Sequence, residues 1–132
     1  MGIFKEEKTI VVYPQLSYKI VGVLFEVYNK FGYGYKEKTY EKMISRYFAD
    51  VAIPFATQVP YHLRINGEII GKYYLDFLVE NRIILEIKQG NYFAKQNINQ
   101  VNSYLKVTGL QLAILANFTP HGIKFMRLLN IK

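Results

Sequence analysis

The spacing of the apolar residues changes along this chain, and that change constrains the fold more than any other feature. Residues 17–31 place apolar side chains three and four positions apart, which predicts a helix with Ser17 as its N-cap and Gly32 at its end. Residues 40–48 repeat this spacing, and the glycine-containing segment FGYGYK between the two stretches should be a turn. The first part of the chain therefore predicts two amphipathic helices.

The next part has the pattern of strands and turns. Asn66-Gly67 lies between two strand-like runs and is typical of a two-residue hairpin turn. A second turn, around residues 80–82, leads into the apolar run IILEIK. Residues 93–108 then return to helical spacing, and Gly109 should end this third helix.

Two further strands complete the pattern. LQLAILANF has the continuous apolar character of a buried strand, and a turn at residues 119–122 leads into a last strand, IKFMRLLNI. The order ααβββαββ predicts an α/β (α+β mixed) fold with one mixed β-sheet flanked by helices. We expect a single domain over residues 1–132, with residues 1–16 as an N-terminal extension and the core at about 17–131.

Composition excludes several classes of function. The chain has no cysteine, so disulfide scaffolds, thiolate metal sites and cysteine nucleophiles are excluded. No apolar run is long enough for a membrane span, and the first residues lack the apolar region of a secretory signal, so we expect a soluble, cytoplasmic protein with no membrane partner. A net charge of +7 favours a polyanionic partner such as nucleic acid, although the basic residues are spread along the whole chain.

Two acidic residues and a lysine interrupt otherwise apolar strands. Strict alternation would place Asp76 on one face of its strand and Leu75 and Phe77 together on the other. In the next strand, Glu86 and Lys88 share a face. Burying an unpaired carboxylate costs several kcal/mol, so such groups are usually paired or bind a metal.

These residues allow two interpretations. One is a structural ion pair of Lys88 with Asp76 or Glu86 at a sheet edge. The other is a site for a hard divalent cation such as Mg²⁺, which binds one or two carboxylates together with waters and substrate phosphates. In the second case the lysine would lie close to a metal-bound water, as a metal-dependent phosphodiesterase needs.

The sequence resembles the PD-(D/E)XK nuclease superfamily. Asp76 followed by Glu86-Ile87-Lys88 is similar to the signature of that superfamily, whose restriction-endonuclease-like core has the order αβββαβ found here from Lys36 onward. The segment Gly34–Tyr40 matches the Gly-x-x-Glu-x-x-Tyr motif of the GxxExxY protein family within it, and Gln100–Tyr104 resembles the Gln-x-x-x-Tyr motif of RecB-type nucleases. The resemblance covers roughly residues 17–130.

The resemblance implies a nuclease that cuts DNA with Mg²⁺, for which Mn²⁺ would substitute. Asp76 and Glu86 would bind the metal, with the Ile87 carbonyl as a third protein ligand. Lys88 would orient or deprotonate the attacking water and balance charge in the transition state. Glu37 would complete the acidic site, directly or through a metal-bound water.

Three further residues would position the substrate: Gln100, Tyr104 and Tyr40. Other interpretations stay open for some of these positions. Glu37 could be a solvated acid early in a helix, and Gln100 and Tyr104 could be a surface pair one turn apart. For the whole chain, the alternatives are a catalytically silent module that binds nucleic acid or a partner protein, and a structural domain with a buried ion network. A homodimer is also open.

Two geometric expectations follow. Asp76 and Glu86 should lie opposite each other in an antiparallel hairpin, which requires an odd loop such as Glu80–Arg82 or a bulge. Two flanking helices should each present a pair toward this cluster, Glu37 with Tyr40 and Gln100 with Tyr104.

Overall fold

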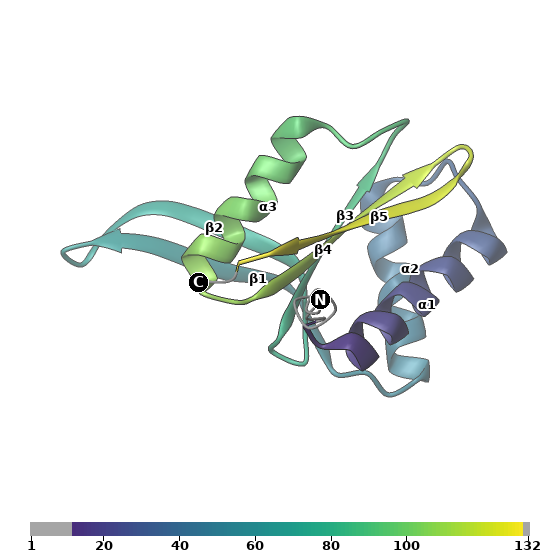
Figure 1. Ribbon diagram of the computed structural model, residues 1–132, viewed down its shortest axis with the longest axis horizontal. Helices are drawn as coiled ribbons and strands as arrows, with labels where there is room; N and C mark the ends of the chain where they lie inside the picture. The colour runs from purple at the N-terminus through teal and green to yellow at the C-terminus, as the bar shows by residue number, and fades with distance from the viewer. Residues whose placement is uncertain (1–11, 131–132) are drawn as a thin grey trace, which may run out of the picture.

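A computed structural model describes residues 12–130, which form one mixed sheet with helices on both of its faces (Figure 1). In chain order the elements are α1 (Pro14–Phe31), α2 (Glu37–Asp50), β1 (Phe55–Ile65), β2 (Glu68–Val79), β3 (Ile83–Gln89), α3 (Lys95–Thr108), β4 (Leu112–Thr119) and β5 (Gly122–Leu129). The predicted fold class and order ααβββαββ are confirmed. No helix in residues 12–130 is long and apolar enough to cross a membrane.

The first helix begins earlier than the sequence pattern predicted. Its N-cap is Tyr13 and its first residue is Pro14, which suits this position because the first helical N–H has no partner inside the helix. Ser17 is therefore not the N-cap but a buried residue inside the helix, and residues 14–16 belong to α1 rather than to an N-terminal extension. Residues 1–11 lie outside the described part. Gly32 ends the helix with φ 74°, as predicted.

The sheet has two antiparallel hairpins joined by a parallel pair. The β1–β2 turn at Asn66-Gly67 has positive φ at both residues, as that dipeptide predicts. β3 pairs with β4 in parallel, and α3 forms the crossover between them. All eight residues of β4 are buried, because helices cover both faces of this strand.

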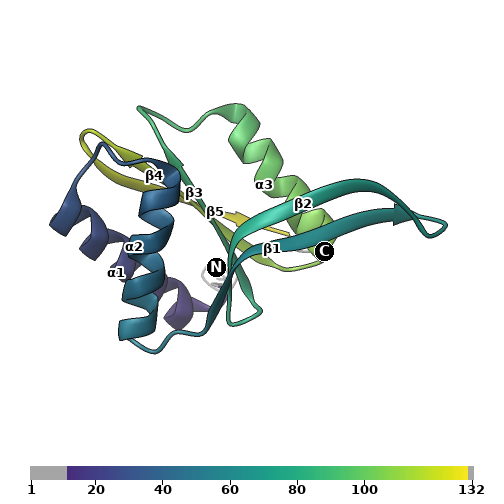
Figure 2. The ribbon, with the colours of Figure 1, turned by 180° about the vertical axis from the view of Figure 1, so that it is seen from behind.

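Two hydrophobic clusters occupy the two faces of the sheet. One cluster joins α1 and α2 to alternate residues of β3, namely Ile83, Leu85 and Ile87. The other joins α3 to the opposite face of the same strands and includes Ile84. Figures 1 and 2 show α1 and α2 on one side of the sheet and α3 on the other. Glu86 is therefore on the α3 face, one strand position from each of two core residues.

The β1–β2 hairpin leaves the sheet part-way along its length, and its far end projects beyond the helices in Figure 2. β2 pairs with β3 only from Phe77 to Val79. Phe77 packs in the α1–α2 cluster, whereas Leu75 packs in the α3 cluster, so the expectation that these two residues share a face is wrong. The change of face occurs where Gln58 of β1 has φ 50°, which interrupts the regular strand conformation.

Candidate active site

Asp76 and Glu86 lie where β2 and β3 separate. The loop between these strands has three residues, Glu80–Arg82, and the last pair of the ladder before separation is Phe77 with Leu85. The next pair in the same register is Asp76 with Glu86, as expected. These two residues contact each other at the fork instead of continuing the ladder.

Hydrogen bonds from the main chain fix both carboxylates. The Asp76 N–H donates to Glu86 Oε2 at 2.7 Å, and the Ile87 N–H donates to Asp76 Oδ2 at 2.9 Å. Each carboxylate thus accepts from a backbone amide next to the point where the β2–β3 ladder ends. The two acidic groups are held side by side as a result.

This arrangement is electrostatically unfavourable for the isolated protein. Burial raises the pKa of the Glu86 carboxyl to about 8, and the neighbouring Asp76 charge adds to that increase. The Asp76 N–H and the positive charge of Lys88 act in the opposite direction. A divalent cation between the two carboxylates would offset both the burial and the repulsion.

The donor set fits a hard cation. Two carboxylates are the number that Mg²⁺ commonly takes from a protein, with waters and substrate oxygens completing the octahedron. Within residues 12–130, no three His, Cys, Asp or Glu side chains come close enough to hold a metal by themselves. The residues present therefore fit a cation that shares its coordination with water and substrate.

Lys88 carries its charge without an ionic partner. In the described part of the chain the ion pairs are Arg46–Asp50 and Arg82–Glu80, so Lys88 pairs with neither Asp76 nor Glu86. The interpretation of these residues as a structural ion pair is therefore wrong for this structure. Lys88 is half-buried at the end of β3 and close enough to Glu86 for its charge to lower the pKa of that carboxyl.

A small cavity connects Asp76 to the start of α2. Its volume is about 140 Å³ and its lining residues are Glu37, Lys38, Glu41, Gln58, Asp76 and Ile87. Glu37, the first residue of α2, thus lines the same cavity as Asp76. Gln58 donates from Nε2 to Glu41 at 3.1 Å and, less closely, to Asp76 at 3.4 Å.

Sequence reasoning missed Glu41 and Gln58. Glu41 lies one helical turn after Glu37, and this spacing could have indicated it. Gln58 lines the cavity from a strand position with φ 50°, a conformation that its residue type does not predict.

Tyr104 and Gln100 of α3 have different environments. Tyr104 is buried against the sheet, and its ring meets Tyr73 edge-on with 5.7 Å between centroids. Burial, with added repulsion from Glu86 and Asp76, raises the pKa of the Tyr104 hydroxyl to about 12, so this group stays protonated near the carboxylates. Gln100 is exposed one turn earlier on the same helix.

Tyr40 does not face the site, which corrects the expectation that it pairs with Glu37. Its ring is fully buried and stacks on Phe118 with 3.9 Å between centroids. Its hydroxyl donates to the Gly32 carbonyl at 2.7 Å. Tyr40 thus fixes the connection between α1 and α2, and through it the position at which α2 begins.

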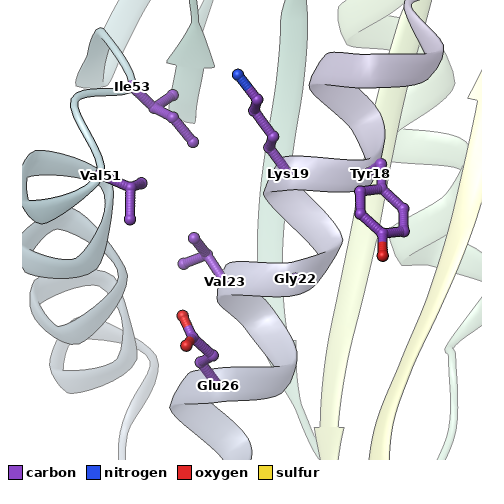
Figure 3. Close-up of a pocket in the computed structure, with 7 residues that line it drawn as sticks. All are labelled: Tyr18, Lys19, Gly22, Val23, Glu26, Val51 and Ile53. Atoms are coloured by element: carbon purple, nitrogen blue, oxygen red, sulfur yellow. The ribbon is translucent and has the colours of Figure 1, made fainter.

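A larger pocket of about 440 Å³ lies between α1 and the end of α2 (Figure 3). Its lining residues are Tyr18, Lys19, Gly22, Val23, Glu26, Val51 and Ile53. None of them belongs to the cavity at Asp76. Its chemistry is that of an apolar groove with one basic and one acidic residue at its edge, which does not resemble a phosphodiesterase site.

The family model of the PD-(D/E)XK nuclease superfamily matches residues 14–127, a range that contains both carboxylates, Lys88 and the cavity. The chain belongs to this superfamily. No curated protein matches the chain at a significant level.

Two solved structures share the fold of this PD-(D/E)XK protein. The crystal structure of SSO0001 has a TM-score of 0.54 and 18% identity over 69% of this chain, and this chain spans about half (48%) of that one. LHK-Exo in complex with dAMP has a TM-score of 0.51 and 15% identity over 94% of this chain and 73% of that one. Another structure, of the alkaline exonuclease LHK-Exo from Laribacter hongkongensis, is more distant, with a TM-score of 0.42 and 11% identity over 93% of this chain and 73% of that one.

Proposed function

We propose that this protein is a metal-dependent nuclease that hydrolyses phosphodiester bonds in DNA, with Mg²⁺ as its metal and Mn²⁺ able to replace it. The observation that carries the proposal is the pair of adjacent carboxylates, Asp76 and Glu86, with Lys88 unpaired beside them. The net charge of +7 supports a nucleic-acid substrate. We also assign the chain to the GxxExxY family, because the Gly34–Tyr40 segment matches its motif.

Asp76 and Glu86 would hold the metal, and the carbonyl of Ile87 would be a third protein ligand. In a strand, the N–H and C=O of one residue point to the same side. Since the Ile87 N–H points to Asp76, its carbonyl also points into the gap between β2 and β3, where the ladder has ended. When bound, the metal would supply Lewis-acid activation of the phosphate and of the attacking water.

Lys88 would act on the same water and on the charge of the transition state. Its ammonium can donate to water or to a phosphate oxygen, because no carboxylate within residues 12–130 forms an ion pair with it. Preorganised charge at a reacting phosphate is worth several kcal/mol in a site of this kind.

The helices on either side would bind water and substrate. Glu37 would hold a metal-bound water through the cavity that it shares with Asp76. Gln100 is exposed and would contact the substrate strand, while the protonated Tyr104 hydroxyl would donate to a phosphate oxygen near the carboxylates. Tyr40 is left out of this set because its hydroxyl is bonded to Gly32.

The test is a cleavage assay on supercoiled, linear, branched and single-stranded DNA and on RNA, with Mg²⁺, Mn²⁺ or EDTA. Asp76→Ala should abolish cleavage. Asp50→Ala is the matched control, because Asp50 is exposed and pairs only with Arg46. We expect metal-dependent cleavage of DNA by the wild type and by Asp50→Ala. Binding of DNA without cleavage under every condition would favour the catalytically silent module instead.

A further inference from the structure

Asn117 is a buried polar residue in strand β4. It is 1% exposed, and neither its Oδ1 nor its Nδ2 has a hydrogen-bond partner among residues 12–130. Such a group costs folding free energy, because it loses its bonds to water and gains none. Buried amides in native proteins are nearly always satisfied, so this exception needs an explanation.

The position of Asn117 in the sheet supplies one. Its parallel partner on β3 is Lys88, and its antiparallel partner on β5 is Lys124. Residues paired across neighbouring strands point to the same face, about 4.8 Å apart. Leu115, two residues before Asn117, packs against α3, so Asn117 and Lys88 share the face that carries Glu86.

Lys88 and Asn117 have complementary hydrogen-bonding groups. A lysine ammonium has three donors and no acceptor, and Lys88 has no ionic partner in the described part of the chain. Asn117 Oδ1 is an acceptor without a donor. Lys124 is exposed, so water can satisfy its ammonium, whereas the half-buried Lys88 has less access to water.

We propose that Asn117 is a positioning residue for Lys88. Its Oδ1 accepts a hydrogen bond from Lys88 Nζ when substrate occupies the site, and this bond holds the flexible lysine beside Glu86. The inference rests on the proposed nuclease function and extends it to a residue that contacts neither metal nor substrate. On this account the unpaired amide is retained for catalysis at the expense of stability, a conflict that is common at functional sites.

The test uses three variants and two measurements. Asn117→Leu keeps the branching and the number of side-chain heavy atoms but removes the acceptor, so we expect kcat to fall about ten- to a hundredfold with little change in KM, because a displaced catalytic group slows the reaction to that extent. The melting temperature of the same variant should rise or stay constant, since no unpaired polar group remains. Asn117→Asp keeps an oxygen at the Oδ1 position and should restore most of kcat.

The matched control is Asn130→Leu. Asn130 Nδ2 donates to the carbonyls of Leu105 at 3.2 Å and Leu110 at 3.4 Å. The loss of these two bonds should lower the melting temperature. At temperatures below the thermal unfolding transition, kcat should be unchanged. A structural role for Asn117 predicts the same result as this control, with no rescue by Asp. That result, or an Asn117→Leu variant with the wild-type kcat, would overturn the positioning role alone. A wild type that cuts no substrate would instead overturn the proposed function and this role with it.

Discussion

At the scale of single residues, Lys88 forms no ion pair within residues 12–130, so its effect on catalysis can be measured apart from its effect on stability. Lys88→Met keeps an unbranched side chain of similar volume but removes its charge, so cleavage should fall by a hundredfold or more, about 3 kcal/mol of transition-state stabilisation. The melting temperature should change little, because no ion pair is lost. Single-turnover cleavage and thermal melts measure the two effects.

Lys124→Met is the matched control, because Lys124 is exposed two strands away in the same row of the sheet. It should cut at the wild-type rate. A Lys88→Met protein that cuts equally fast, or that melts many degrees lower in EDTA, would contradict the role given to this lysine.

The raised pKa of Glu86 predicts a pH-dependent stability of the metal-free protein. The carboxyl has a pKa of about 8 in the folded chain and its ordinary value, about 4.5, in the unfolded chain, so the folded state holds the proton more tightly. The stability that the bound proton contributes is fully present below pH 4.5 and is lost as the pH rises through about 8. Glu86→Gln should therefore become more stable than the wild type as the pH rises from about 5 to about 9. The difference in the free energy of unfolding should reach several kcal/mol at most.

Thermal melts in EDTA across this pH range measure the difference, and Glu26→Gln, at an exposed position of α1, is the control. Mg²⁺ should stabilise the wild type at high pH and have little effect on Glu86→Gln. A stability difference that does not depend on pH would contradict the assignment.

Sequence alone singled out Asp76, Glu86 and Lys88 as candidates, because charge within an apolar strand is costly and therefore unusual. The same reasoning fails for Tyr40, since an amphipathic ring suits a site and a core equally well. Asn117 gave no signal either, because its neighbour Lys88 becomes known only with the order of the strands.

At the scale of elements, the order of helices and strands was predictable from spacing, and the change of face along β2 was not. It occurs opposite Gln58, a non-glycine residue with φ 50°. Nothing in the type of this residue requires that conformation, so strict alternation placed Leu75 with Phe77. The start of α1 was missed for a similar reason, since Ser17 is a good N-cap by type but Pro14 precedes it.

Substitutions at Gln58 test whether the change of face along β2 depends on the conformation of this residue. Gln58→Gly removes the side chain but favours the positive φ, so the protein should keep its stability or gain up to about 1 kcal/mol. Gln58→Val should lose at least about 1 kcal/mol, because a β-branched side chain opposes this conformation. Denaturant unfolding measures both, and equal stability of the two variants would show that the bend does not depend on this residue.

At the scale of the whole molecule, the net charge of +7 predicts binding to nucleic acid that weakens as salt increases. Asp76→Ala should bind without cutting, so its affinity for DNA can be measured between about 50 and 200 mM salt. The slope of log K against log salt gives the number of phosphate contacts, and adding Lys88→Met should reduce it by about one at most. Binding that does not change with salt would argue against a phosphate-contacting surface.

The fork between β2 and β3 also gives the protein its own spectroscopic reporter. The amides of Asp76 and Ile87 donate to carboxylates rather than to the backbone, so their hydrogen exchange and ¹⁵N chemical shifts depend on the charge of those side chains. A titration with Mg²⁺ should shift these two signals first and leave distant amides, such as that of Gly109, unchanged. Occupancy of the proposed metal site can therefore be followed by NMR without a substrate.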